Sequence, residues 1–166
     1  SHPGNILLLD GANKKKKGEA QLGLIDYGQV KEVVKSDRVL LSRMIVALCE
    51  KDKEIAADLL IEAGYKTKYM RRDLMFSYAT VTLDQDNKDV TNGKHIQNFM
   101  EWLQKEDPVV ELPRKFVMVA RCSLLLRGLG HAIGQERSIC QCWRERAETL
   151  LREEGVDWKT GKKLNK

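Results

Sequence analysis

The chain has 166 residues, of which 42% are hydrophobic and 32% are charged, and its formal net charge is +5. This composition is typical of a globular protein with a packed core, and it excludes a wholly disordered chain. Charged residues interrupt every apolar run well before the roughly 20 residues that a membrane-spanning helix requires. Much of the positive charge lies in residues 14–17 and near the C-terminus, where we expect solvated surface and no nucleic-acid partner.

The first predicted element is a β-hairpin. Residues 5–9 and 22–25 are short apolar runs on either side of GANKKKKGEA, whose glycines, asparagine and lysines are typical of an exposed turn. We therefore expect two antiparallel strands, with the lysines of residues 14–17 in the turn and not in a helix.

After residue 30 the apolar residues recur at steps of three and four, which predicts a series of helices. Ser36 is a candidate N-cap of the first helix, and Asp52 and Gly64 are candidates for the N-cap and the end of the second. We expect these two helices to form an antiparallel pair. The first four predicted helices cover about residues 39–48, 53–63, 70–81 and 93–105.

Two more helices are predicted in the C-terminal third. After Pro113 comes FVMVARCSLLLRGLG, which is apolar on nearly every face and should end at Gly128 or Gly130. We therefore predict that this helix is the most buried one. The last helix covers about residues 136–154 and ends before Gly155, and a loose tail should follow it.

These patterns predict a mainly α fold with one short β-hairpin. We expect a single domain with three segments, in which residues 1–30 hold the hairpin, residues 31–155 hold the helices and residues 156–166 form the tail. No period of 20–50 residues repeats along the chain, which excludes solenoid and propeller architectures.

The four cysteines are predicted to be free thiols in a reducing intracellular compartment. Cys49, Cys122, Cys140 and Cys142 lack the C-x-x-C spacing of many metal and redox sites. Three of them lie in apolar helical patterns, where a free cysteine behaves as a small hydrophobic residue. Cys140 and Cys142 would face different sides of a helix, which argues against a shared zinc ion.

Two motifs at the ends of the predicted hairpin carry chemistry. The first strand follows His2-Pro3-Gly4-Asn5, and the second strand leads into Asp26-Tyr27-Gly28. Mg²⁺ prefers hard oxygen ligands, and in kinase folds an asparagine after the catalytic loop and the aspartate of a DFG-type motif supply them. We predict Asn5 and Asp26 as metal ligands that also bind the cofactor Mg·ATP, with Gly28 freeing the backbone beside them.

Each motif alone is also compatible with a simple structural role, since Pro-Gly turns and strand ends of this composition are common. Their order, the apolar strands between them and the helices that follow together favour the kinase-type interpretation. We expect His2 to order the loop by hydrogen bonding and not to act as a general base.

With these motifs the sequence resembles the UbiB/ADCK (aarF-type) family of atypical kinases, whose members carry an HPGN loop and an (I/L)D(F/Y)GQV segment. Residues 2–5 and 25–30 match these two motifs, and the resemblance continues in residues 112–114 (LPR), in residues 121–130 (RCSLLLRGLG) and at Trp143 and Ala147. It implies the C-terminal lobe of a protein-kinase-like fold, binding of ATP and Mg²⁺, and an ATPase or phosphotransferase activity linked to isoprenoid quinone or lipid metabolism. It also implies a mitochondrial or plastid location.

The resemblance implies that parts of the family's active site lie outside this chain. The family's Lys-x-Gly-Gln segment, its ATP-anchoring lysine, the glutamate partner of that lysine and its catalytic aspartate all precede HPGN. The chain opens with SHPGNILLL, without an initiator methionine, so we expect a fragment that lacks the N-terminal lobe and contains no catalytic base. Alone it should be inactive, and its partners should be a nucleotide, the N-terminal lobe and a membrane surface or lipid.

Two alternatives remain open. An aminoglycoside- or choline-kinase-type phosphotransferase also has an HPGN-like loop followed by IDxG. A noncatalytic helical module, which uses its basic surface to bind an acidic membrane or a protein partner, belongs to a different class.

Overall fold

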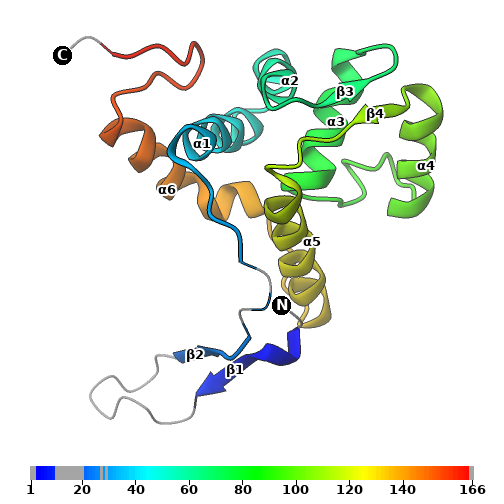
Figure 1. Cartoon of the computed structure of the whole chain (residues 1–166). Coiled ribbons are helices and arrows are strands. Elements are labelled where there is room, and N and C mark those ends of the chain that lie inside the picture. The colour runs from blue at the N-terminus through cyan, green and yellow to red at the C-terminus, as the bar shows by residue number, and fades with distance from the viewer. Residues whose placement is uncertain (1–2, 10–20, 27, 29, 165–166) are drawn as a thin grey trace. The chain divides into compact units, whose positions relative to one another are not determined.

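The computed structural model describes residues 3–9, 21–26, 28 and 30–164. Its contacts divide the chain into two compact units, unit 1 over Ser1–Glu32 and unit 2 over Val33–Lys166. Within the described residues the fold is mainly α with a short antiparallel hairpin, which confirms the predicted class (Figure 1). The division lies close to the predicted border between hairpin and helices.

Unit 1 is built on the hairpin. A single 3₁₀ turn, Pro3–Asn5, leads into β1 (Ile6–Leu9), which pairs antiparallel with β2 (Gln21–Leu24). Ile6 lies opposite Leu24, and Leu9 lies opposite Gln21. The predicted strands are therefore correct to within one residue, while the predicted turn at residues 14–17 lies outside the described part of the chain.

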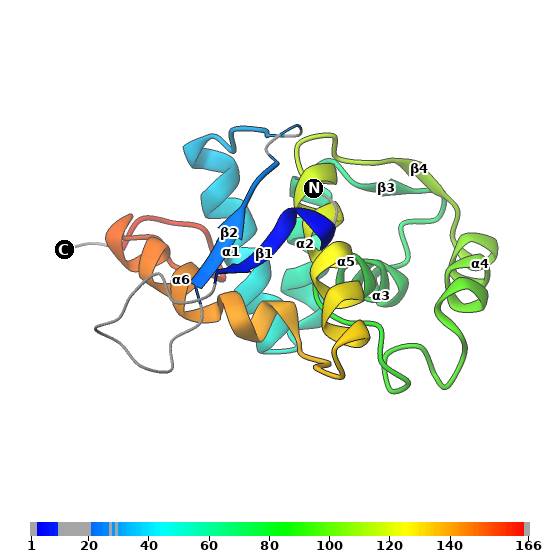
Figure 2. The same ribbon diagram turned by 90° about the horizontal axis from the view of Figure 1, so that it is seen from below.

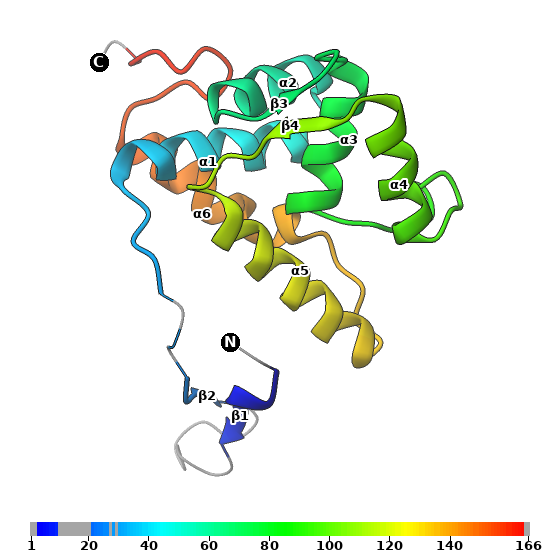
Figure 3. The ribbon, with the colours of Figure 1, turned by 45° about the vertical axis from the view of Figure 1, so that its right-hand side comes forward.

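Unit 2 contains the helices, each within a few residues of its predicted range, so local periodicity located them well. They pack as α1 on α6 and α2, α2 on α3, and α3 on α5 (Figures 1 and 3). Their bounds are α1 (Lys35–Cys49), α2 (Lys53–Glu62), α3 (Arg72–Leu83), α4 (Ile96–Glu106), α5 (Val117–Ala132) and α6 (Ile139–Glu153). None of the described helices is long and apolar enough to cross a membrane.

A second two-stranded sheet, absent from the sequence prediction, joins β3 (Lys66–Thr67) to β4 (Val109–Glu111). The two strands lie side by side in Figure 2, although α3 and α4 separate them in the chain. Strands of two and three residues that pair across two helices carry no turn signal between them, so the sequence gives no sign of this sheet.

The core of unit 2 is centred on α1 and α3. Eight residues of α1 are buried, and the fully buried side chains of Met75 and Tyr78 come from α3. The prediction that the helix after Pro113 is the most buried is wrong, because among the residues of α5 only Ser123 is buried and Leu124 is 50% exposed. Helix α5 carries apolar side chains on nearly every face, but its neighbours in unit 2 cover only part of that apolar surface.

The helix ends follow local rules where a side chain or a glycine sets them. Asp52 caps α2 by accepting a hydrogen bond from the Ile55 amide at 3.2 Å, and Gly64 follows with φ +98, as predicted. Ser36 is not the cap of α1, since that helix begins at Lys35 with Val34 in the N-cap position.

The end of α5 also differs from its prediction. The helix continues through Gly128 and Gly130 to Ala132, and the residue with a left-handed backbone is Gly134, at φ +69. A glycine within a helix costs only about 1 kcal/mol relative to alanine, which tertiary packing readily offsets.

Asp107 organises the loop between β3 and α3. Its carboxylate accepts hydrogen bonds from Thr67 Oγ1 at 2.7 Å, from the Tyr69 amide at 2.7 Å and from the Arg71 amide at 2.8 Å. Burial alone would raise the pKa of Asp107, but these hydrogen bonds, the one from Thr67 foremost, outweigh it and lower the pKa below its usual range. This buried acid is therefore kept ionised by the Thr67 hydroxyl and by the two backbone amides that it orders.

The segment after α6 is ordered over residues 156–164, so the predicted loose tail is wrong there. Val156 and Lys163 form an antiparallel bridge, and Gly161 turns the chain with φ +70. Arg43 of α1 holds the turn by donating from Nε to the Trp158 carbonyl oxygen at 2.9 Å and from Nη2 to that of Lys159 at 3.0 Å. A long-range contact, which a tail's composition does not reveal, orders this segment.

Candidate functional site

The hairpin register brings the two predicted metal ligands together. Asn5 ends the 3₁₀ turn before β1, and Asp26 follows β2 by two residues. The Ile25 amide donates to the Asn5 carbonyl oxygen at 3.1 Å, which extends the ladder one step beyond the Ile6 and Leu24 pair. Antiparallel pairing thus places Asn5 and Asp26 at the same end of the hairpin, although they are 21 residues apart in sequence.

The side chains of these two residues are in direct contact. Asn5 Nδ2 donates a hydrogen bond to Asp26 Oδ2 at 2.8 Å, and the Gly28 amide donates to Asp26 Oδ1 at 2.7 Å. Both carboxylate oxygens of Asp26 therefore have a fixed partner. Asp26 is exposed and Asn5 is half-buried, so a ligand can reach the carboxylate from solvent.

Gly28 allows the close approach of the backbone to Asp26. A Cβ atom at position 28 would lie 3.0 Å from Asp26 Oδ1, which is tighter than a normal contact. The glycine thus lets the amide of residue 28 donate to the carboxylate without displacing it. The neighbouring motif residues His2 and Tyr27 lie outside the described part of the chain.

The pair has the chemistry of a partial Mg²⁺ site. A carboxylate and a carboxamide are hard oxygen donors, and Mg²⁺ is commonly held by one or two protein groups, with water and phosphate oxygens completing its octahedron. Among the described residues no group of three or more His, Cys, Asp and Glu side chains could hold a metal ion.

Several residues of unit 2 that match the family make contacts within its packed helices. On α5, Arg127 donates from Nη2 to the Val81 carbonyl oxygen at 2.7 Å, and burial lowers the pKa of its guanidinium. On α6, Ala147 is buried in the core and Trp143 is partly buried against it. Cys140 is buried while Cys142 is exposed, in accordance with the prediction that they face different sides of a helix.

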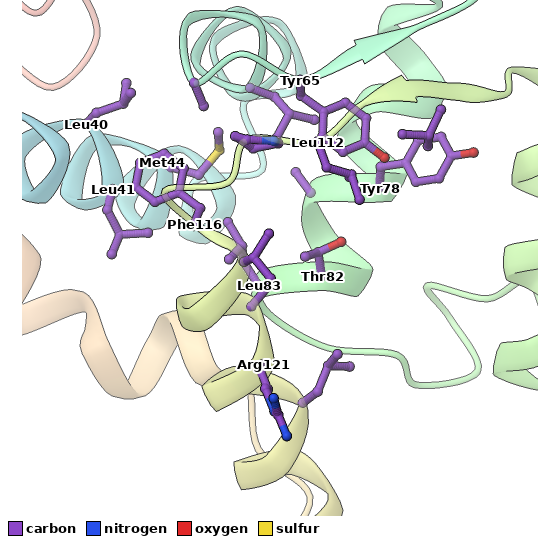
Figure 4. A pocket seen from close by; sticks show the side chains of 18 of the residues that line it. Leu40, Leu41, Met44, Tyr65, Tyr78, Thr82, Leu83, Leu112, Phe116 and Arg121 are labelled. Carbon is purple, nitrogen blue, oxygen red and sulfur yellow. The ribbon is translucent and has the colours of Figure 1, made fainter. Parts of the chain in front are cut away.

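The sequence prediction missed a cavity of about 480 Å³ inside unit 2 (Figure 4). Residues of α1, α2, α3, α4 and α5 and the segment before α5 line it. The only sequence signal was the apolar character of α5 on nearly every face, which we interpreted as a sign of burial. The lining is Leu40, Leu41, Met44, Leu60, Ala63, Tyr65, Tyr78, Ala79, Thr82, Leu83, Met100, Gln104, Val109, Leu112, Pro113, Phe116, Val117, Ala120, Arg121 and Leu124.

Comparison of the chain with protein-family models, with curated protein sequences and with solved structures gave no match. The kinase-type interpretation therefore depends on the motif residues and on the geometry of Asn5, Asp26 and Gly28.

Proposed function

We propose that the chain is the C-terminal lobe portion of a kinase-like phosphotransferase or ATPase, in which Asn5 and Asp26 bind the Mg²⁺ ion of Mg·ATP. The observation that carries the proposal is the 2.8 Å contact between Asn5 Nδ2 and Asp26 Oδ2 at one end of a short hairpin. Phosphoryl transfer depends mainly on positioning and on neutralising phosphate charge, which a carboxylate-bound Mg²⁺ provides.

The hydrogen bond between the two side chains holds them close enough to share one cation. The amide nitrogen of Asn5 faces the Asp26 carboxylate, because two oxygens in that position would repel each other. A half-turn of the carboxamide exchanges Nδ2 for Oδ1 and presents two oxygens to one ion. Mg²⁺ binding would then replace one hydrogen bond with two metal–oxygen contacts, at the cost of a single side-chain rotation.

Gly28 has a supporting role in this proposal. Its amide holds Asp26 Oδ1 at 2.7 Å, which leaves Oδ2 as the oxygen directed at Asn5 and at the metal. A carboxylate fixed in this way loses little conformational freedom when the ion binds. Larger residues at position 28 would push on the same oxygen, since a Cβ there would lie only 3.0 Å from it.

The resemblance supports the phosphotransferase class and a role in isoprenoid quinone or lipid metabolism in a mitochondrion or plastid. The family's ATP-anchoring lysine and catalytic aspartate have no counterpart in the 166 residues, so we propose that this chain binds Mg·ATP weakly and does not hydrolyse it alone. Binding, and not turnover, is therefore the property to measure.

The test uses Mn²⁺ in place of Mg²⁺, since a bound Mn²⁺ ion broadens the NMR signals of nearby nuclei. With Mn·ATP, we expect the Gly28 amide and the Asn5 side-chain amide signals of the chain to broaden first. Asp26→Ala should remove the broadening at Gly28, and Asn5→Ala should weaken it. Asp89→Ala, which removes an exposed loop carboxylate in unit 2, should behave as the wild-type chain.

Two results would contradict the proposal. Broadening at Gly28 that persists in a folded Asp26→Ala chain would place the ion elsewhere. Equal broadening of the amide signals near all exposed carboxylates, with the signals near Asp89 broadened as much as those near Asp26, would indicate unspecific attraction of the cation. That result would favour a noncatalytic module.

A further inference from the structure

The cavity in unit 2 is almost wholly apolar, and all of its lining residues belong to that unit. Leucine, methionine, alanine, valine, proline and aromatic side chains make up most of its wall. The hydroxyl of Tyr78, one of the few polar groups there, already donates to the Asp107 carbonyl oxygen at 3.1 Å. Water in such a space finds few partners, so the cavity favours an apolar occupant.

The size of the cavity limits that occupant. A volume of about 480 Å³ lies within the range of about 300–1,000 Å³ that is usual for small-molecule sites. A methylene group needs about as much space as a water molecule, roughly 30 Å³, so the cavity has room for a chain of roughly 12–16 carbon atoms.

One end of the cavity carries a positive charge. Arg121 is the only charged residue in the lining, and its guanidinium has no ion pair or hydrogen bond among the described residues. Figure 4 shows its guanidinium at the margin of the site, pointing away from the apolar side chains of Met44, Phe116 and Leu83. No carboxylate lines the cavity among the described residues.

The open side of the cavity lies along α5. Val117 is 47% exposed and Leu124 is 50% exposed, and both line the space. These two residues and Arg121 follow one another at steps of three and four, so they form one stripe of the helix. The stripe is apolar on both sides of a single cation, which matches a molecule with an apolar chain and an anionic head.

We propose that unit 2 binds a single-chain anionic amphiphile, with its hydrocarbon chain in the cavity and its carboxylate or phosphate head on Arg121. The charge of the lining selects the sign of the head group, and the volume selects the length of the chain. All residues of this binding site belong to unit 2, and the proposal does not depend on the proposed Mg·ATP function.

Calorimetric titration of the purified chain tests the proposal, with each probe below its critical micelle concentration. Sodium dodecanoate and dodecyl phosphate should bind, and the ratio of their dissociation constants distinguishes a fatty acid from a phosphorylated lipid as the source of the head group. Octanoate should bind at least tenfold more weakly, since it fills less of the cavity. Dodecyltrimethylammonium, which has the opposite charge, should bind at least tenfold more weakly than dodecanoate.

Three variants locate the ligand. Ala120→Leu and Val117→Phe each fill part of the cavity from α5 and should raise the dissociation constant of dodecanoate tenfold or more. Arg121→Gln should raise it about fivefold and leave the affinity for neutral dodecanol unchanged. Arg137→Gln, which changes an exposed arginine outside the lining, is the matched control and should bind as the wild-type chain.

The variants also define what overturns the proposal. Unchanged dodecanoate affinity in either cavity-filling variant, with its circular dichroism spectrum intact, would place the chain elsewhere. Equal binding of the cationic and anionic probes would remove the role of Arg121. If light scattering shows a dimer that Val117→Phe converts to a monomer, a second copy of the chain, and not an amphiphile, covers the open side of the cavity.

Discussion

Arg43, in the middle of α1, donates a hydrogen bond from Nε to the carbonyl oxygen of Trp158 at 2.9 Å, across 115 residues of sequence. Its Nη2 donates to the carbonyl oxygen of the next residue, Lys159, at 3.0 Å, and its Nη1 pairs with Glu62 of α2 at 3.1 Å. The arginine is buried, so these partners replace the water that its guanidinium loses. One side chain thus ties the segment after α6 to α1 and α2.

Arg43→Met should loosen this segment while it keeps most of the apolar stem of the side chain. We expect the free energy of unfolding to fall by about 2–3 kcal/mol, since charge-assisted hydrogen bonds are lost and two carbonyl oxygens lose their partner. Trypsin should cut faster at Lys159 and Lys162. Arg146→Met, at an exposed position of α6, should change stability by less than about 0.5 kcal/mol. Equal trypsin rates in both variants would disprove the anchoring role.

Asp107→Asn should destabilise unit 2 at neutral pH by about 2–3 kcal/mol, because the amide accepts fewer hydrogen bonds than the carboxylate. The folded pKa of Asp107 is lowered, so its contribution is fully present above the unfolded value of about 3.9. The contribution is lost as the pH falls through the folded pKa. Urea unfolding between pH 7 and pH 2 should therefore show a smaller loss of stability on acidification in the variant. Identical pH profiles for the variant and the wild-type chain would contradict this assignment.

The four cysteines should differ in their reaction with iodoacetamide. Cys122 and Cys142 are exposed and should be alkylated first. Burial raises the pKa of Cys49 to about 11, so its alkylation should be slow at pH 7.5 and should accelerate as the pH approaches 10. Cys140 is fully buried, and burial and the nearby Asp84 raise its pKa, so it should react only after unfolding. Peptide mass spectrometry measures all four rates, and early alkylation of Cys140 would contradict the described core.

The contrast between α4 and α5 predicts opposite sensitivities to mutation. Phe99→Ala removes a ring that is 1% exposed and should cost about 3–5 kcal/mol. Leu126→Gln changes a residue of α5 that is 41% exposed and lies outside the cavity lining, so it should cost less than about 1 kcal/mol. Guanidinium unfolding measures both changes. A large loss of stability for Leu126→Gln would show that α5 is covered in solution.

The sequence by itself determined the local features. The periods of the apolar residues located the hairpin and the helices, because a strand and a helix repeat their buried positions at different steps. Asp52 and Gly64 marked the two ends of α2, since a cap and a left-handed glycine act within a few residues. The contact between Asn5 and Asp26 was also predictable, because a hairpin pairs residues by counting outward from its turn.

Only the tertiary structure decided the long-range features. Apolar periodicity shows that a helix has surface to bury but not which neighbour covers it, so it could not show that α1 and not α5 lies at the core. The pairing of β3 with β4 and the binding of the last turn by Arg43 join residues from distant parts of the chain. The cavity has the same origin: five helices bring their apolar residues to one place, and the space that remains depends on how they pack, which no single segment encodes.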